Sequence, residues 1–77
     1  MNIYRISQTV NDDYDTWDSA VVVASSEEAA RQNHPGGFHD GSWGGWCLPK
    51  DVKVELIGVV LFDDIEAGVV CASYNAG

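Results

Sequence analysis

Four stretches of the chain carry the hydrophobic patterns that predict β-strands. Residues Asn2–Val10 are rich in β-formers and lack proline and glycine. Ser19–Ser25 contains three consecutive valines, which is typical of a strand that is buried on both faces. In Val52–Phe62 apolar residues, Leu56 among them, alternate with charged ones, so this strand is predicted to bury one face. Val69–Tyr74 is predicted to be the last strand and to form a hairpin with the third.

One short helix is predicted between the second and third strands. Ser25 is the expected N-cap, and Glu28 completes a capping box three residues later. The helix is expected to cover about Ser26–Asn33 and to end before Pro35 and Gly36. The element order is therefore β-β-α-β-β. It predicts that residues 1–77 form a single small α+β domain, with a four-stranded, mostly antiparallel sheet and one short helix on a face.

The segment Gly36–Lys50 matches no regular element. It places five glycines among the large aromatic residues Phe38, Trp43 and Trp46. Glycines permit unusual backbone angles, and the aromatic rings are expected to anchor the loop to the core. Trp17, which lies in an acidic stretch, is the best candidate for a surface aromatic residue.

The charge balance of the chain is strongly acidic. Four Lys and Arg residues stand against twelve Asp and Glu, which gives a formal net charge of −8. Sites for DNA or RNA phosphates are built from clustered Lys and Arg, so we do not expect this chain to bind nucleic acid directly. An anionic membrane surface is disfavoured for the same reason. A basic protein partner is favoured instead.

The acidic residues gather in the first turn and in the turn between the third and fourth strands. In an antiparallel sheet these two turns can lie at one end, where they would form one acidic rim. Its carboxylates would bind Lys and Arg side chains that normally hold phosphates, and two aromatic residues of the first turn would supply buried contact. The alternative is that acidic turns only keep a small protein soluble. The predicted partner-binding residues are Asp12, Asp13, Tyr14, Asp15, Trp17, Asp18, Asp63, Asp64 and Glu66.

Metal-binding patterns are weak. Asp13 and Asp15 begin like a calcium loop, but Trp17 occupies the third ligand position and Asp18 stands where that loop needs glycine. The histidine and cysteine spacing matches no standard zinc motif. We therefore expect no metal site.

Catalytic signatures are equally weak. Cys47 with His34 or His39 would make a nucleophile–base pair if the fold brought them together, but no local signature supports one. A phosphate-binding loop, a dinucleotide fingerprint and a serine nucleophile elbow are absent from the sequence. We expect no cofactor and no enzymatic activity.

The cysteines and the termini bear on location. Cys47 and Cys71 do not make a secreted disulfide scaffold and are expected to be buried free thiols, although a disulfide between them stays open. The N-terminus lacks the pattern of a signal peptide, and the apolar runs are too short to cross a bilayer. The expected location is the cytosol.

Four segments together resemble a group of small uncharacterised proteins of phages and bacterial mobile elements. They are Tyr14–Ala24, Glu27–Arg31, Val52–Gly58 and Gly68–Gly77. Size and acidity also resemble the anti-CRISPR and other anti-defence proteins of phages. That second resemblance, which rests on charge and length, implies a protein that occupies the nucleic-acid channel of a CRISPR effector.

The leading hypothesis is a phage-type inhibitor that acts as a DNA mimic in the host cytosol. It would bind a basic nucleic-acid-binding surface, of a CRISPR effector complex in the first place, and block DNA or guide engagement by steric and electrostatic competition. One alternative is a small-ligand module that binds a nucleotide signal in the segment Gly36–Lys50, called the Gly/Trp loop below. A small enzyme that uses Cys47 is another. Edge strands and a small core also invite formation of a homodimer.

Overall fold

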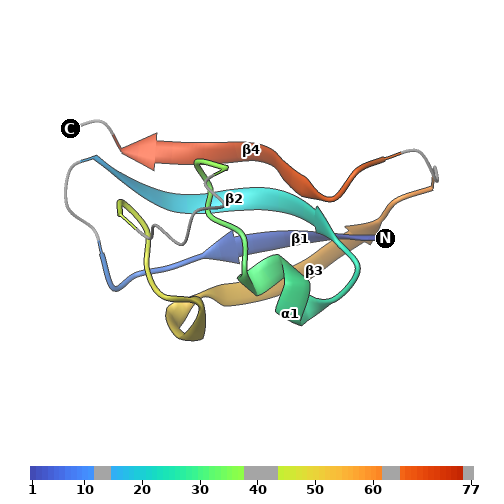
Figure 1. The fold of residues 1–77 in the computed structure, drawn as a ribbon, viewed down its shortest axis with the longest axis horizontal. Coiled ribbons are helices and arrows are strands. Elements are labelled where there is room, and N and C mark those ends of the chain that lie inside the picture. Colours follow the sequence, from blue (N-terminus) through green and yellow to red (C-terminus); the bar gives the residue numbers. More distant parts are fainter. Residues whose placement is uncertain (12–14, 38–43, 62–64, 76–77) are drawn as a thin grey trace.

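Four strands in one sheet dominate the structure, a computed structural model that describes residues 1–11, 15–37, 44–61 and 65–75. The sheet is antiparallel, and its strand order is β3-β1-β2-β4 (Figure 1). The predicted α+β architecture and the β-β-α-β-β order are confirmed. The elements are β1 (Asn2–Ser7), β2 (Thr16–Ala24), α1 (Glu27–Arg31), the short 3-10 helix η1 (Pro49–Asp51), β3 (Lys53–Val59) and β4 (Gly68–Asn75).

The predicted hairpin between β3 and β4 is wrong. These two strands lie at opposite edges of the sheet, and β1 and β2 occupy its centre (Figure 1). β3 pairs with β1, while β4 pairs with β2. The two central strands, β1 and β2, contain the most completely buried side chains, because a central strand has a neighbour on both sides and can be covered over its whole length.

The core lies between one face of the sheet and a layer formed by α1 and the segment that follows it (Figure 1). Trp46 is only 2% exposed, so its predicted role as an anchor of the Gly/Trp loop is confirmed. Leu56, in contrast, is 62% exposed although the alternating pattern predicted its burial. Leu56 lies on β3, an outer strand of the sheet, and the layer that contains α1 does not cover its side chain. The buried cluster consists of Tyr4, Ile6, Ala20, Val22, Ala24, Ala30, Trp46, Cys47 and Val52.

Irregularities in strand pairing decide which side chains reach the core. Gly58 lies opposite Ile3 and Leu56 lies opposite Tyr4, so Ile57 is an extra residue in β3. This bulge lies next to Gly58. A second bulge lies in β2, where Asp18 is passed over in the pairing with β4. Such a bulge shifts the side-chain alternation by one residue.

Helix α1 is shorter than predicted, and its N-cap is one residue later. The Ser26 hydroxyl, rather than that of Ser25, accepts a hydrogen bond from the backbone N–H of Ala29 at 3.1 Å. Either serine suits the position chemically, and the turn out of β2 selects the second. None of the helices among the described residues has the length and apolar character needed to cross a membrane.

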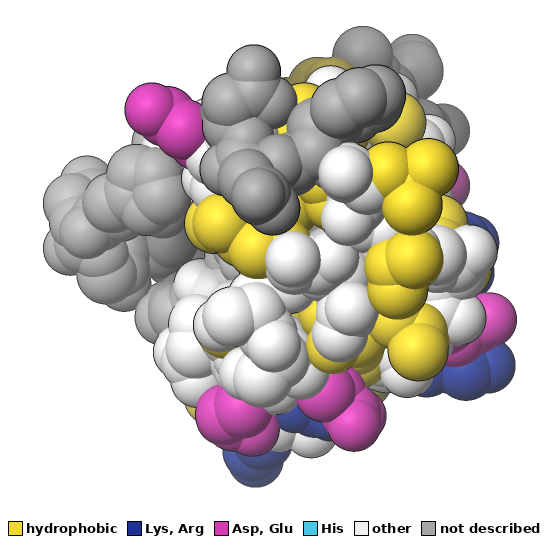
Figure 2. All heavy atoms as spheres, turned by 90° about the vertical axis from the view of Figure 1, so that its right-hand side faces the viewer, with side chains coloured by type: hydrophobic (Ala, Val, Ile, Leu, Met, Phe, Trp, Pro, Cys, Tyr) yellow, Lys and Arg dark blue, Asp and Glu magenta, His cyan; other side chains and the backbone are white. Residues whose placement is uncertain are grey.

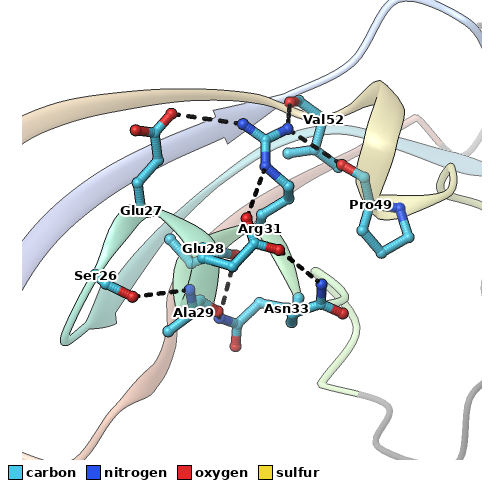
Figure 3. A network of polar contacts seen from close by, with 10 residues as sticks. Ser26, Glu27, Glu28, Ala29, Arg31, Asn33, Pro49 and Val52 are labelled. Atoms are coloured by element: carbon cyan, nitrogen blue, oxygen red, sulfur yellow. Dashed lines mark hydrogen bonds and ion pairs between the residues drawn. The ribbon is translucent and has the colours of Figure 1, made fainter.

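Arg31 fastens α1 to the segment that leads into β3 (Figure 3). Its guanidinium donates to the carbonyl oxygens of Pro49 and Val52. It also forms ion pairs with Glu27 and Glu28, at 3.5 and 3.9 Å. Two of the acidic residues of the chain are therefore compensated by a cation of their own helix.

Candidate functional site

The side chains of Asp15, Trp17 and Tyr74 meet where β2 begins and β4 ends, and the exposed carboxylate of Asp18 follows Trp17 along β2. We call this group the Trp17 cluster; its members are Asp15, Trp17, Asp18 and Tyr74. Trp17 lies directly opposite Tyr74 in the pairing of the two strands, and their ring centroids are 4.6 Å apart. The Tyr74 hydroxyl donates to Asp15 Oδ1 at 3.3 Å. Both carboxylates are exposed, so they are available to a partner.

The Trp17 ring is held from behind by the Gly/Trp loop. The backbone N–H of Trp17 donates to the carbonyl oxygen of Gly45 at 2.8 Å. Gly45 has a φ of +74°, and a Cβ at this position would lie 2.8 Å from Cζ3 of Trp17. Only glycine permits so close an approach of the loop backbone to the ring. The bulge at Asp18 is what places Trp17 on the loop side of the sheet.

His34 supports the same ring and is itself held by backbone groups. Its ring meets that of Trp17 edge to face, with centroids 5.0 Å apart. Its Nδ1 accepts from the Gly36 N–H, and its Nε2 lies 2.9 Å from the Gly44 carbonyl oxygen. A carbonyl can only accept, so Nε2 is the donor in this contact. His34 therefore has a structural role in closing the loop, and neither ring nitrogen is directed at Cys47.

The two cysteines differ in environment, and both are free thiols. Cys47 is buried as predicted. Burial, followed by the negative charge of Asp51, raises the pKa of its thiol. A nucleophilic cysteine needs the opposite shift, so the surroundings of Cys47 do not favour catalysis. Cys71 is exposed, which contradicts the prediction of burial, because β4 is an outer strand.

The positive charges lie on four segments of the chain, β1, α1, η1 and β3. Arg5 and Lys53 approach Glu55 at 3.5 and 3.9 Å, and Arg31 pairs within α1. Together β1, α1, η1 and β3 carry four cations and four carboxylates, so their charges sum to zero. The net charge of −8 belongs to the other eight acidic residues, which are Asp12, Asp13, Asp15, Asp18, Asp40, Asp63, Asp64 and Glu66. Four of these eight lie in or beside the connection that leads into the Trp17 cluster.

The predicted single acidic rim is wrong. Asp15 and Asp18 lie at the end of the sheet where Thr16 pairs with Asn75. Glu66 precedes Gly68, which pairs with Val23 near the far end of β2. At the usual rise per strand residue, Asp18 and Val23 are separated by roughly 17 Å. The prediction assumed that both turns lie at one end of an antiparallel sheet. β2 and β3 are both antiparallel to β1 and so run in the same direction, which puts the connections before β2 and after β3 at opposite ends. Of the predicted site residues, Asp12, Asp13, Tyr14, Asp63 and Asp64 lie outside the described part of the chain.

Tyr74 is the site residue that sequence reasoning missed. Partial burial raises the pKa of its phenol, as do the negative charge of Asp15 and the hydrogen bond to that carboxylate. Tyr74 is separated from the acidic turn by almost the whole chain, and only the register of β4 against β2 brings them together. The signal available in the sequence was a tyrosine at the end of a strand of otherwise small residues.

The other face of the sheet carries a shallow hollow of about 170 Å³. It is lined by small side chains of β2 and β4 and by Arg5. Pockets for small organic ligands usually measure about 300–1,000 Å³, so this hollow is too small to hold one. Within the described residues, histidine, cysteine and carboxylate side chains form no group of three that could hold a metal ion.

Comparison with known proteins adds no family to this picture. The chain matches no protein-family model, no curated protein and no solved structure. The resemblance to phage and mobile-element proteins therefore stays a prediction, and the functional argument rests on the Trp17 cluster.

Proposed function

We propose that this chain is an acidic interaction protein that binds a basic, nucleic-acid-binding surface of another protein and competes there with the nucleic acid. The observation that carries the proposal is the Trp17 cluster, in which exposed carboxylates flank a supported aromatic pair. No cation of the described chain is paired with Asp15 or Asp18 in the salt bridges found.

The chemistry of the cluster suits such a partner. Carboxylates form charge-assisted hydrogen bonds with Lys and Arg side chains, as phosphates do. Tryptophan and tyrosine are enriched among the residues that dominate binding energy, because a rigid ring supplies contact area at a small entropic cost. The ring of Trp17 is fixed by Gly45 and His34, so little side-chain freedom is lost when a partner binds.

A CRISPR effector complex is the first partner to test. Its nucleic-acid channel is strongly basic, and the small size and acidity of the chain resemble those of anti-CRISPR proteins. Binding by this route requires no turnover, because the protein only has to occupy the channel. The function proposed is thus that of an inhibitor.

The experiment is a pull-down with tagged full-length protein from bacterial lysates that contain CRISPR effectors. Three forms are compared: wild type, the double variant Asp15→Asn/Asp18→Asn, and the control Glu28→Gln/Glu66→Gln. Both double variants remove two negative charges, but the control changes carboxylates away from the Trp17 cluster. Asparagine keeps an acceptor for Tyr74 and tolerates the positive φ of Asp15.

The expected result is a nucleic-acid-binding complex that wild type and control retain at low salt, that high salt releases, and that the Asp15/Asp18 variant fails to retain. Equal retention by the two double variants would contradict the proposal. So would a partner that is insensitive to salt, because pairing between exposed charges is screened. The absence of any protein partner would favour the small-ligand hypothesis.

A further inference from the structure

Large apolar side chains are exposed along the outer strand β3 and just beyond it. We call them the β3 patch; its members are Met1, Leu56, Ile57, Val59 and Leu61. Their exposed fractions range from 52% to 84%. Met1 belongs to the group because its carbonyl oxygen accepts from the Val60 N–H at 2.9 Å. Figure 2 shows hydrophobic side chains gathered along one side of this end of the molecule.

The size of the β3 patch is notable for so small a chain. Together its side chains leave roughly 500 Å² of apolar surface, which is near the upper end for the largest patch on a soluble monomer. The largest apolar patch on a soluble monomer is often functional.

The backbone of β3 is unpaired on the same side. β3 is the last strand of the sheet, so its outer N–H and C=O groups have no strand partner among the described residues. Edges of this kind are normally guarded by charged side chains. Lys53 and Glu55 guard the first half of β3, while the second half carries only apolar residues and Gly58.

We propose that the β3 patch binds the β3 patch of a second copy of this chain, giving a homodimer in which the two β3 edges run antiparallel. Two patches of roughly 500 Å² bury about 1,000 Å² in total, the lower bound for a specific interface. A two-fold axis lets the backbone N–H and C=O groups of each β3 edge form hydrogen bonds with those of the other, and the same residues then lie on both sides of the interface. This inference goes beyond the proposed function and does not depend on it.

Charge also favours a second copy at this edge. Within β3 itself Lys53 and Glu55 cancel, and Glu55 is also paired with Arg5 of β1. An identical chain that approaches along β3 therefore meets no excess negative charge on the strand, although each chain carries −8 in total.

The other outer strand is a poorer candidate. β4 contains Cys71, Ala72 and Ser73 at its middle, and such small side chains would bury little apolar surface. Its end carries Tyr74, which is engaged in the Trp17 cluster. Pairing through β3 leaves that cluster free on both copies.

The salt dependence of the proposed dimer has a defined sign. Two chains of like net charge repel each other, and salt screens that repulsion while it leaves apolar burial intact. Dimerisation is therefore expected to strengthen as salt is added. Binding of a basic partner by the Trp17 cluster is expected to weaken, so the two surfaces are distinguishable.

The test is sedimentation equilibrium of the full chain from micromolar to submillimolar concentrations, at about 0.05 M and about 0.5 M NaCl. Reductant is present so that a disulfide through the exposed Cys71 does not contribute. Val59→Lys is compared with Val70→Lys. The two positions are both valines on outer strands, 59% and 63% exposed, and both substitutions add one positive charge.

We expect wild type and Val70→Lys to form dimers, more tightly at high salt. Val59→Lys is expected to weaken dimerisation by about tenfold or more, because two lysines would be buried in one apolar interface. A wild type that stays monomeric throughout, equal effects of the two lysines, a larger effect of Val70→Lys, or a dimer weakened by salt would each overturn the proposal. Should Val59→Lys fail to fold by circular dichroism, Leu61→Ser replaces it, since that side chain is 84% exposed.

Discussion

Asp15 is the residue at which the backbone and the candidate site constrain each other. Its φ is +62°, a left-handed conformation that aspartate and asparagine tolerate better than other residues with a side chain. Its carboxylate accepts the hydrogen bond of Tyr74, and the next residue begins β2. The turn into the strand and the presentation of the carboxylate thus depend on the same side chain.

Replacing Asp15 separates these two roles. Asp15→Val is expected to destabilise the fold by about 1–2 kcal/mol, because a β-branched residue is strained at positive φ. Asp15→Asn keeps the conformation and an acceptor for Tyr74, so its stability is expected to stay within about 0.5 kcal/mol of wild type. Urea unfolding measures both values. A valine variant as stable as wild type would show that this backbone conformation imposes no strain.

Tyr74 gives the Trp17 cluster a pH signature. Partial burial and the neighbouring Asp15 carboxylate raise the pKa of its phenol, so the neutral form is favoured in the folded protein. The unfolded chain then ionises first. The resulting stabilisation is present below the ordinary tyrosine pKa and is lost as the pH rises above about 10.

Phenolate absorbance during an alkaline titration tests this account. The Tyr74 component, identified as the one missing in Tyr74→Phe, should titrate at a higher pH in wild type than in Asp15→Asn, because the variant removes the negative charge. If both proteins titrate at the same pH, the contact between Asp15 and Tyr74 does not persist in solution.

At the scale of elements, the sequence predicted which segments become strands and helix, but not how the strands neighbour one another. Alternating apolar residues in β3 indicate one buried face whether the strand is central or at an edge. The pattern therefore could not predict that Leu56 is exposed. Ser25 and Ser26 are equally good N-caps, and only the geometry of the turn distinguishes them. The hairpin between β3 and β4 failed for a similar reason, since closeness along the chain does not determine which edge a strand takes.

The Gly/Trp loop provides a test of how elements support the site. Gly45 and Gly37 have nearly equal positive φ values, +74° and +78°, but a Cβ meets the Trp17 ring only at Gly45. Gly37→Ala should therefore cost about 1 kcal/mol from backbone strain alone. Gly45→Ala should cost about 1–3 kcal/mol more, because it also overpacks the ring. Chemical denaturation gives both values, and equal losses would show that the loop does not hold Trp17.

Across the whole molecule, the charge is divided in a way that composition alone does not reveal. The chain is acidic by −8, yet the charges of β1, α1, η1 and β3 sum to zero. The acidic turn that precedes β2 was recognisable as a candidate site from its aspartates and Trp17. Tyr74 and the support from Gly45 and His34 were not, because they depend on the register of β4 and on the path of the loop. Glu66 was included in the predicted rim because both acidic turns were expected at one end of the sheet, and the direction of β3 places them at opposite ends.

The proposed function and the proposed dimer use separate surfaces. The Trp17 cluster lies where β2 begins and β4 ends, and the β3 patch lies toward the far end of the opposite edge strand. A dimer through β3 would present two acidic clusters to its partner. Multivalent binding of that kind raises the apparent affinity without any new contact, provided that both clusters reach their sites.

The central claim is that the Trp17 cluster and nucleic acid compete for one basic surface. The most direct measurement is fluorescence anisotropy of a labelled oligonucleotide bound to the captured partner, titrated with this protein at several oligonucleotide concentrations. The account predicts complete displacement, with an apparent inhibition constant that rises in proportion to the oligonucleotide concentration, and no displacement by Asp15→Asn/Asp18→Asn. Retention of the oligonucleotide in a ternary complex with this protein would contradict it.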